Sequence, residues 1–246
     1  MDARLKVLSN DCFVGVVLNM LNIGDIDLLK SALELLFSLS RSTRGLKPEL
    51  LTEAVSTTSC QLLEHCDGKV KELVLKILCN TVLNYDSLQI DVTIIVSKTC
   101  KLVALSTTRE LALWLLKNLT FIDKAELKQA ILEAIPLEEF VSMASNGTAG
   151  EQLQSLGLLR NLLYPYAVVN LSCGSERVKT LLLDSSLLPV VMDLLERQEE
   201  EVKKAVSEFL VNMCWREHFP QAGERLRVLG VGEKLRQAEE AFPRET

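Results

Sequence analysis

Aromatic residues are scarce in this chain of 246 residues, which has two tryptophans, three tyrosines and seven phenylalanines. Histidine is scarcer still, with only His65 and His218. Cys60, His65 and Cys66 carry atoms that can bind metals, but adjacent ligands on a helix point apart and no second cluster follows, so we expect no zinc site. Gly-rich phosphate loops and the common protease and hydrolase motifs are also missing. We therefore expect no catalysis, no cofactor and no small-molecule substrate.

The chain also lacks long apolar runs and any excess of positive charge. No run of 18 apolar residues could span a bilayer, and no signal peptide is apparent. The formal charge of −6 offers no general attraction to nucleic acid. The seven cysteines form no Cys-x-x-Cys pair, which is typical of free thiols in a reducing compartment. We expect a cytoplasmic protein, which can also be nuclear, with no membrane or nucleic-acid partner.

One pattern does recur, five times, where helix-like runs end. Its anchor residues are separated by 42, 38, 43 and 51 residues, and they are Ser38, Asn80, Asn118, Asn161 and Asn212. A period of about 40 residues with helical content throughout is the mark of armadillo or HEAT repeats. We therefore predict an all-α fold, a right-handed α-solenoid of about five armadillo-type repeats followed by a C-terminal capping helix.

The predicted repeats divide a single armadillo-like domain, residues 1–246. Their approximate bounds are 10–46, 48–88, 89–124, 125–175 and 181–219, with the cap at 220–246. Ser106, Thr107 and Thr108 are candidates for the N-cap of the helix that follows them. The fourth repeat is long enough for an additional helix or loop around Cys173–Lys179.

Two segments resemble armadillo repeats residue by residue. Ala112-Leu-Trp-Leu-Leu-Lys-Asn-Leu-Thr120 is similar to the third-helix motif Ala-Leu-Trp-x-Leu-x-Asn-Leu. The run from Leu188 to Leu195, with the acidic turn and Val202-Lys-Lys-Ala, is similar to the second helix joined to that third helix. The Asn-Leu motif favours armadillo over HEAT geometry.

The resemblance implies a binding groove made by the third helices. In armadillo proteins the motif asparagine contacts the backbone of an extended ligand, and a tryptophan four residues earlier packs on ligand side chains. Here the asparagines would be Asn80, Asn118, Asn161 and Asn212, and the tryptophan would be Trp114. The other interpretation of the asparagines is hydrogen bonding at helix ends or between repeats, and Trp114 could equally be a core residue.

The basic residues Lys117 and Arg160 stand directly before two of the asparagines, and Lys76 lies nearby. If these side chains face the groove, its middle favours acidic or phosphorylated partner segments. The alternative is that Lys117 and Arg160 are solvated helix residues. The tryptophan positions of the other repeats hold Glu34, Lys76, Gly157 and Glu208, so a full tryptophan array is absent.

Two functional classes follow, both with a protein partner. The first is an adaptor that binds an extended segment in its groove. The second is a structural subunit of a larger assembly, held through its terminal repeats. The segment Gly223-Glu-Arg-Leu-Arg-Val-Leu-Gly-Val-Gly-Glu-Lys-Leu-Arg236 resembles the end of the armadillo subunit of GID/CTLH-type ubiquitin ligases. An open polar groove would favour the first class, and an exposed apolar strip on a terminal repeat would favour the second.

Overall fold

The fold was determined as a computed structural model, which describes residues 11–41, 53–82, 91–121, 125–163, 187–196, 200–214, 224, 226–234 and 236. Within these ranges all regular structure is helical and no strand occurs. The chain divides into two compact units, Met1–Ile122 and Asp123–Thr246. Each unit is described by itself below.

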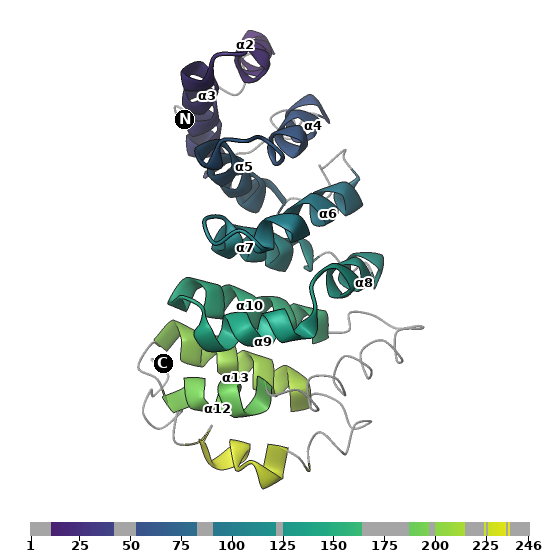
Figure 1. The fold of residues 1–246 in the computed structure, drawn as a ribbon, viewed down its shortest axis with the longest axis vertical. Helices are drawn as coiled ribbons and strands as arrows, with labels where there is room; N and C mark the ends of the chain where they lie inside the picture. Colours follow the sequence, from purple (N-terminus) through teal and green to yellow (C-terminus); the bar gives the residue numbers. More distant parts are fainter. Residues whose placement is uncertain are drawn as a thin grey trace. The chain divides into compact units, whose positions relative to one another are not determined.

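Unit 1 consists of helix pairs. Its described helices are α2 (Asp11–Asn22), α3 (Ile26–Ser40), α4 (Glu53–Leu62), α5 (Gly68–Thr81), α6 (Val92–Val103) and α7 (Arg109–Leu119). Within each pair, α2 packs on α3, α4 on α5 and α6 on α7. The second members of the pairs are also stacked, because α5 lies between α3 and α7 and packs against both (Figure 1).

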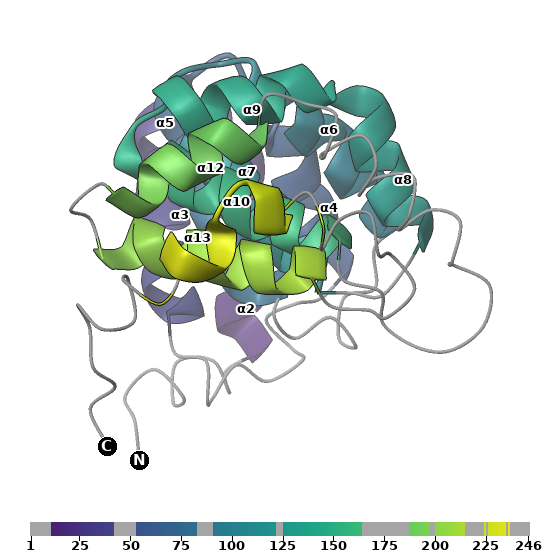
Figure 2. The same ribbon diagram turned by 90° about the horizontal axis from the view of Figure 1, so that it is seen from below.

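Unit 2 also contains packed helix pairs. Its described helices are α8 (Ala125–Ala134), α9 (Leu137–Asn146), α10 (Ala149–Leu163), α12 (Leu187–Glu196) and α13 (Glu200–Cys214). Helix α9 packs on α10 and α12 on α13, and the two pairs join through α10 against α13 and α9 against α12 (Figures 1 and 2).

The core is built from leucines at a fixed place in the repeated pattern. The residue two positions before each anchor is a leucine in all five repeats, and each is at most 3% exposed: Leu36, Leu78, Leu116, Leu159 and Leu210. A helix that places one leucine at this position against its neighbours buries the same stripe in every repeat. At about 25 cal/mol per Å² of apolar surface, each buried leucine contributes roughly 2 kcal/mol to folding.

Aspartates begin several helices. The side chain of Asp25 accepts hydrogen bonds from the backbone N–H of Asp27 and Leu28 at the start of α3. Asp67 does the same for Lys69 and Val70 at the start of α5, and Asp91 for Thr93 at the start of α6. Each carboxylate satisfies backbone donors that the first turn of a helix leaves without a partner.

Of the three candidates for the cap of α7, Thr108 stands at the N-cap position, but its side chain accepts no hydrogen bond from the helix. Its hydroxyl donates backwards to the carbonyl of Leu102 at 3.0 Å, and the side chain is buried. Thr108 therefore fastens the end of α6 instead of the start of α7.

The additional helix or loop expected around Cys173–Lys179 lies outside the described residues, and so does most of the predicted cap. No helix in the described part of the chain is both long and apolar enough to cross a membrane.

Candidate functional site

The anchor positions of the first three repeats lie on the stacked helices α3, α5 and α7. We refer to the side chains that these helices present around the anchors as the α3–α5–α7 face: Phe37, Arg41, Lys76, Asn80, Trp114, Lys117 and Asn118. All of them belong to unit 1. The third-helix stack therefore brings together four of the seven predicted groove residues, namely Asn80, Trp114, Lys117 and Asn118.

The two asparagines on this face tie each helix to the one before it. Nδ2 of Asn118 donates to the backbone carbonyl of Cys79 on α5 at 2.9 Å, and Asn118 is 5% exposed. Nδ2 of Asn80 donates to Oγ of Ser40 on α3 at 2.8 Å. Each amide thus uses one N–H to hold the adjacent third helix in register. A ligand contact, which remains a prediction, would have to use the amide oxygen or the second N–H.

Trp114 is the large apolar side chain of α7 that is exposed to solvent. It is 36% exposed, whereas Leu113, Leu115 and Leu116 beside it are fully buried. Trp114 stands one helical turn before Asn118, which places both on the same side of α7. Exposure of a tryptophan among leucines that are completely buried is what a stacking surface for a ligand requires.

Phe37 gathers two cations that sequence reasoning did not bring together. Nζ of Lys76 on α5 lies 5.7 Å from the centroid of its ring, and the guanidinium carbon of Arg41 lies 6.0 Å from it. A cation over an aromatic face is held by the ring quadrupole. Phe37 occupies the position directly before the anchor Ser38, where other repeats have Lys117 and Arg160. That shared position was the signal that could have placed it in the site.

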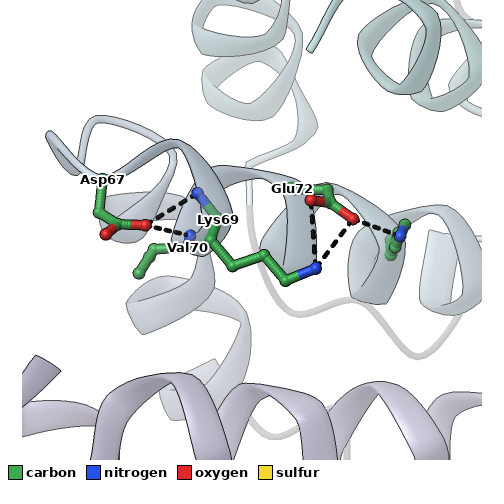
Figure 3. A network of polar contacts seen from close by, with 5 residues as sticks. Asp67, Lys69, Val70 and Glu72 are labelled. Atoms are coloured by element: carbon green, nitrogen blue, oxygen red, sulfur yellow. Dashed lines mark hydrogen bonds and ion pairs between the residues drawn. The ribbon is translucent and has the colours of Figure 1, made fainter. Parts of the chain in front are cut away.

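Two of the three lysines of α5 share one carboxylate. Glu72 accepts from Lys69 at 3.3 Å (Figure 3). It also accepts from Lys76. The hydrogen bond from Lys76, followed by that from Lys69, lowers the pKa of the Glu72 carboxyl below its usual 4.5. At neutral pH this group of three side chains keeps one net positive charge. Arg41 and Lys117 add to it, while the exposed Glu34 and Glu110 oppose it.

The corresponding groups in unit 2 are engaged with each other. Arg160 on α10 forms an ion pair with Glu208 on α13, and its Nε donates to Oδ1 of Asn161 at 3.2 Å. Asn161 is 8% exposed, and the surrounding residues 154–159 of α10 are all buried. Asn212 lies within α13, but its side chain is outside the described residues. Around Asn161 unit 2 differs from unit 1 in two ways: the tryptophan position holds the buried Gly157, and Arg160 is paired with Glu208.

Three buried thiols lie on helices α4, α5 and α6 of unit 1. Cys60, Cys79 and Cys100 are free and buried, and burial raises the pKa of each. For Cys100 the pKa rises to about 11, so the thiol is protonated at neutral pH and packs as a small apolar group. Within the described ranges, no three His, Cys, Asp or Glu side chains are grouped so as to hold a metal ion.

Solved structures identify the fold. A designed armadillo repeat protein in complex with the peptide (KR)4 aligns with a TM-score of 0.67 at 17% identity, over 85% of each chain. An engineered protein aligns with a TM-score of 0.74 at 18% identity, over 95% of this chain and 90% of its own. The chain has the armadillo-repeat fold. This confirms the predicted all-helical class and the resemblance drawn from the repeated motif.

Sequence relatives of this armadillo-repeat chain are distant and much longer. GID complex subunit 5 of Schizosaccharomyces pombe is 30% identical over 168 residues, which are 65% of this chain and 21% of that protein. Armadillo repeat-containing protein 8 of Danio rerio is 26% identical over 166 residues, 66% of this chain and 25% of that protein. The chain therefore spans about a fifth to a quarter of the length of these relatives. No family model matches it.

Proposed function

We propose that the chain is a non-enzymatic adaptor that binds an extended, acidic or phosphorylated segment of a partner protein along the α3–α5–α7 face. One observation carries this proposal: an exposed tryptophan and three cations lie on the same stack of third helices. An extended segment could place its backbone against the amide oxygens of Asn80 and Asn118 and its acidic side chains against Arg41, Lys76 and Lys117. The protein is acidic overall, so this recognition would depend on the local cations of the α3–α5–α7 face.

Electrostatics favours an acidic partner over a basic one on this face. The designed armadillo repeat protein that shares the fold is in complex with (KR)4, a basic peptide. Here the tryptophan position of the second repeat holds Lys76, and a cation at that place repels lysine and arginine side chains of a ligand. Opposite charges across an interface raise both selectivity and association rate, and the effect weakens with salt.

The proposal is tested with the full chain and a fluorescein-labelled ten-residue peptide of alternating glutamate and alanine. Fluorescence anisotropy at low salt gives its affinity for the wild type, for the double variant Lys76→Glu, Lys117→Glu, and for Trp114→Ala. Removing close charge pairs and a stacked aromatic should weaken binding roughly 10-fold or more in each case. A second peptide that contains phosphoserine shows whether the face binds phosphate groups or carboxylates more tightly.

Lys101→Glu is the matched control. Lys101 is exposed on α6, outside the face, so its reversal changes the net charge by two without touching the third helices. The single variant Lys76→Glu changes the net charge by the same amount and is compared with it directly. Circular dichroism confirms that each variant keeps its helices. Equal weakening by Lys101→Glu and by Lys76→Glu would show that only net charge matters, and the proposal would then be wrong.

A second function is favoured by the relatives, one of which is named as a subunit of the GID complex. In this alternative the chain is a structural subunit of a larger assembly such as a ubiquitin ligase. Val228, which is 74% exposed, and Leu229, which is 40% exposed, offer an apolar contact in the segment 224–236. Gel filtration of the tagged chain from cells should then show a large complex that Val228→Asp disrupts. The variant Lys76→Glu, Lys117→Glu should leave that complex intact.

A further inference from the structure

The ion pair between Arg160 and Glu208 joins two positions of the repeated pattern. Arg160 stands directly before the anchor Asn161, and Glu208 stands four residues before the anchor Asn212, where the armadillo motif has tryptophan. The pair connects α10 to α13, the two helices that pack together in unit 2. The side chain of Arg160 is 24% exposed and that of Glu208 is 40% exposed, so both reach solvent.

The single positive charge of Arg160 is balanced by the single negative charge of Glu208. A guanidinium fork fits a carboxylate closely, and charge-assisted bonds of this kind are among the stronger hydrogen bonds of proteins. Nε of the same guanidinium is used by Oδ1 of Asn161. Arg160 is thus engaged by two groups of its own chain. In unit 1, by contrast, Lys69 and Lys76 share the single carboxylate of Glu72 and leave a net positive charge.

We propose that Glu208 is a specificity-determining residue, a resident carboxylate that keeps Arg160 from the acidic groups of a partner. Acidic recognition is thereby confined to the α3–α5–α7 face. This inference rests on the proposed function, because it assumes that acidic segments are the ligands. A carboxylate that belongs to the chain has a high effective concentration at Arg160, so a partner carboxylate in solution must displace it to bind there.

The test uses the labelled glutamate–alanine peptide and the full-length variant Glu208→Gln. Glutamine keeps the shape of the side chain but removes its charge, which leaves a partly exposed guanidinium available. The affinity for the peptide should rise roughly 3- to 10-fold at low salt, and this gain should fall as salt is added. Adding Arg160→Met to Glu208→Gln should abolish the gain, because the cation that caused it is gone.

Glu208→Ala serves as a second variant if Glu208→Gln does not fold, and the same rise is expected. No gain in affinity with folded variants, or a gain that persists in the double variant with Arg160→Met, would overturn the inference. The unit 1 variants test the proposed function independently of this inference. If Lys76→Glu, Lys117→Glu weakens binding while Glu208→Gln changes nothing, only the inference fails. If the first leaves binding intact while Glu208→Gln raises it, the face assigned by the proposed function is wrong, and what stands is only that Glu208 blocks Arg160.

Discussion

The side chain of Asn118 connects two third helices through one buried hydrogen bond to the carbonyl of Cys79. Replacing it with alanine leaves that carbonyl without its donor in an environment that water reaches poorly. We expect Asn118→Ala to lower the free energy of unfolding by about 1–3 kcal/mol, measured by urea denaturation. The matched control is Asn22→Ala, since Asn22 also donates to a backbone carbonyl, that of Leu18, but is exposed. Equal losses for the two variants would contradict the structural role of Asn118.

Gly147 is the glycine that the packing of unit 2 requires. A Cβ at this position would lie 2.4 Å from the backbone oxygen of Met143 and 2.9 Å from Cβ of Glu151. The backbone oxygen cannot move aside without disturbing the end of α9. We expect Gly147→Ala to destabilise the protein by about 1–3 kcal/mol in thermal or urea unfolding. Gly15→Ala in α2 should be neutral or stabilising, because no atom lies within 4 Å of its added Cβ.

Helix α5 combines the caps and charges that position the face. Asp67 caps its first turn and also forms an ion pair with Lys30 of α3 at 2.8 Å. The hydrogen bond from Lys30 lowers the pKa of the Asp67 carboxyl, and the backbone donors of α5 act in the same direction. The start of α5 is therefore tied both to its own backbone and to the neighbouring repeat.

The carboxylate of Glu72 makes the stability of α5 dependent on acid pH. Its pKa is lowered in the folded protein below the usual 4.5, so the unfolded chain binds more protons as the pH falls. The stabilisation is present above the unfolded pKa and is lost as the pH falls through the folded one. We expect wild type to exceed Glu72→Gln in stability at pH 6, with the difference disappearing toward pH 3 in urea titrations. If the difference in stability did not depend on pH, the charge of Glu72 could not be its cause. Because the interaction is between charges, 1 M salt should reduce the difference at pH 6.

At the scale of the whole molecule, the chain divides after Ile122 into two compact units. Units of stacked repeats derive stability from each repeat and its neighbours, so a set of adjacent repeats can fold without the rest. We expect the fragment 1–122 to be helical by circular dichroism and to unfold cooperatively. A fragment without helical signal would show that unit 1 depends on contacts with unit 2.

The same division allows the peptide-binding site to be assigned to one unit. If the α3–α5–α7 face is the acidic-segment site, the fragment 1–122 should bind the glutamate–alanine peptide by itself once it is shown to fold. Loss of binding in a folded fragment would place the site elsewhere. This measurement separates a face contained in unit 1 from a surface that requires both units.

The sequence by itself determined the repeats and the helices. Periodicity is a local property, and a leucine at the same place in each repeat, such as Leu78 or Leu116, must be buried wherever such helices stack. The motif also placed Trp114 and the asparagines on one side of their helices, because residues three and four apart share a helix face. Thr108 was among the predicted caps of α7 and stands at that position, but its hydroxyl donates to a competing acceptor, the carbonyl of Leu102, instead of capping the helix.

Only the tertiary structure decided the partners of the polar groups. Asn118 donates to a carbonyl 39 residues earlier, and Arg160 pairs with Glu208, 48 residues later. Phe37 meets Lys76 across two helices in the same way. Such pairings depend on the register of neighbouring repeats, which side-chain volumes and helix ends set jointly across the packed interface. The pattern along one helix tells on which side of the helix each residue lies. It does not tell which residue of a neighbouring helix that residue contacts.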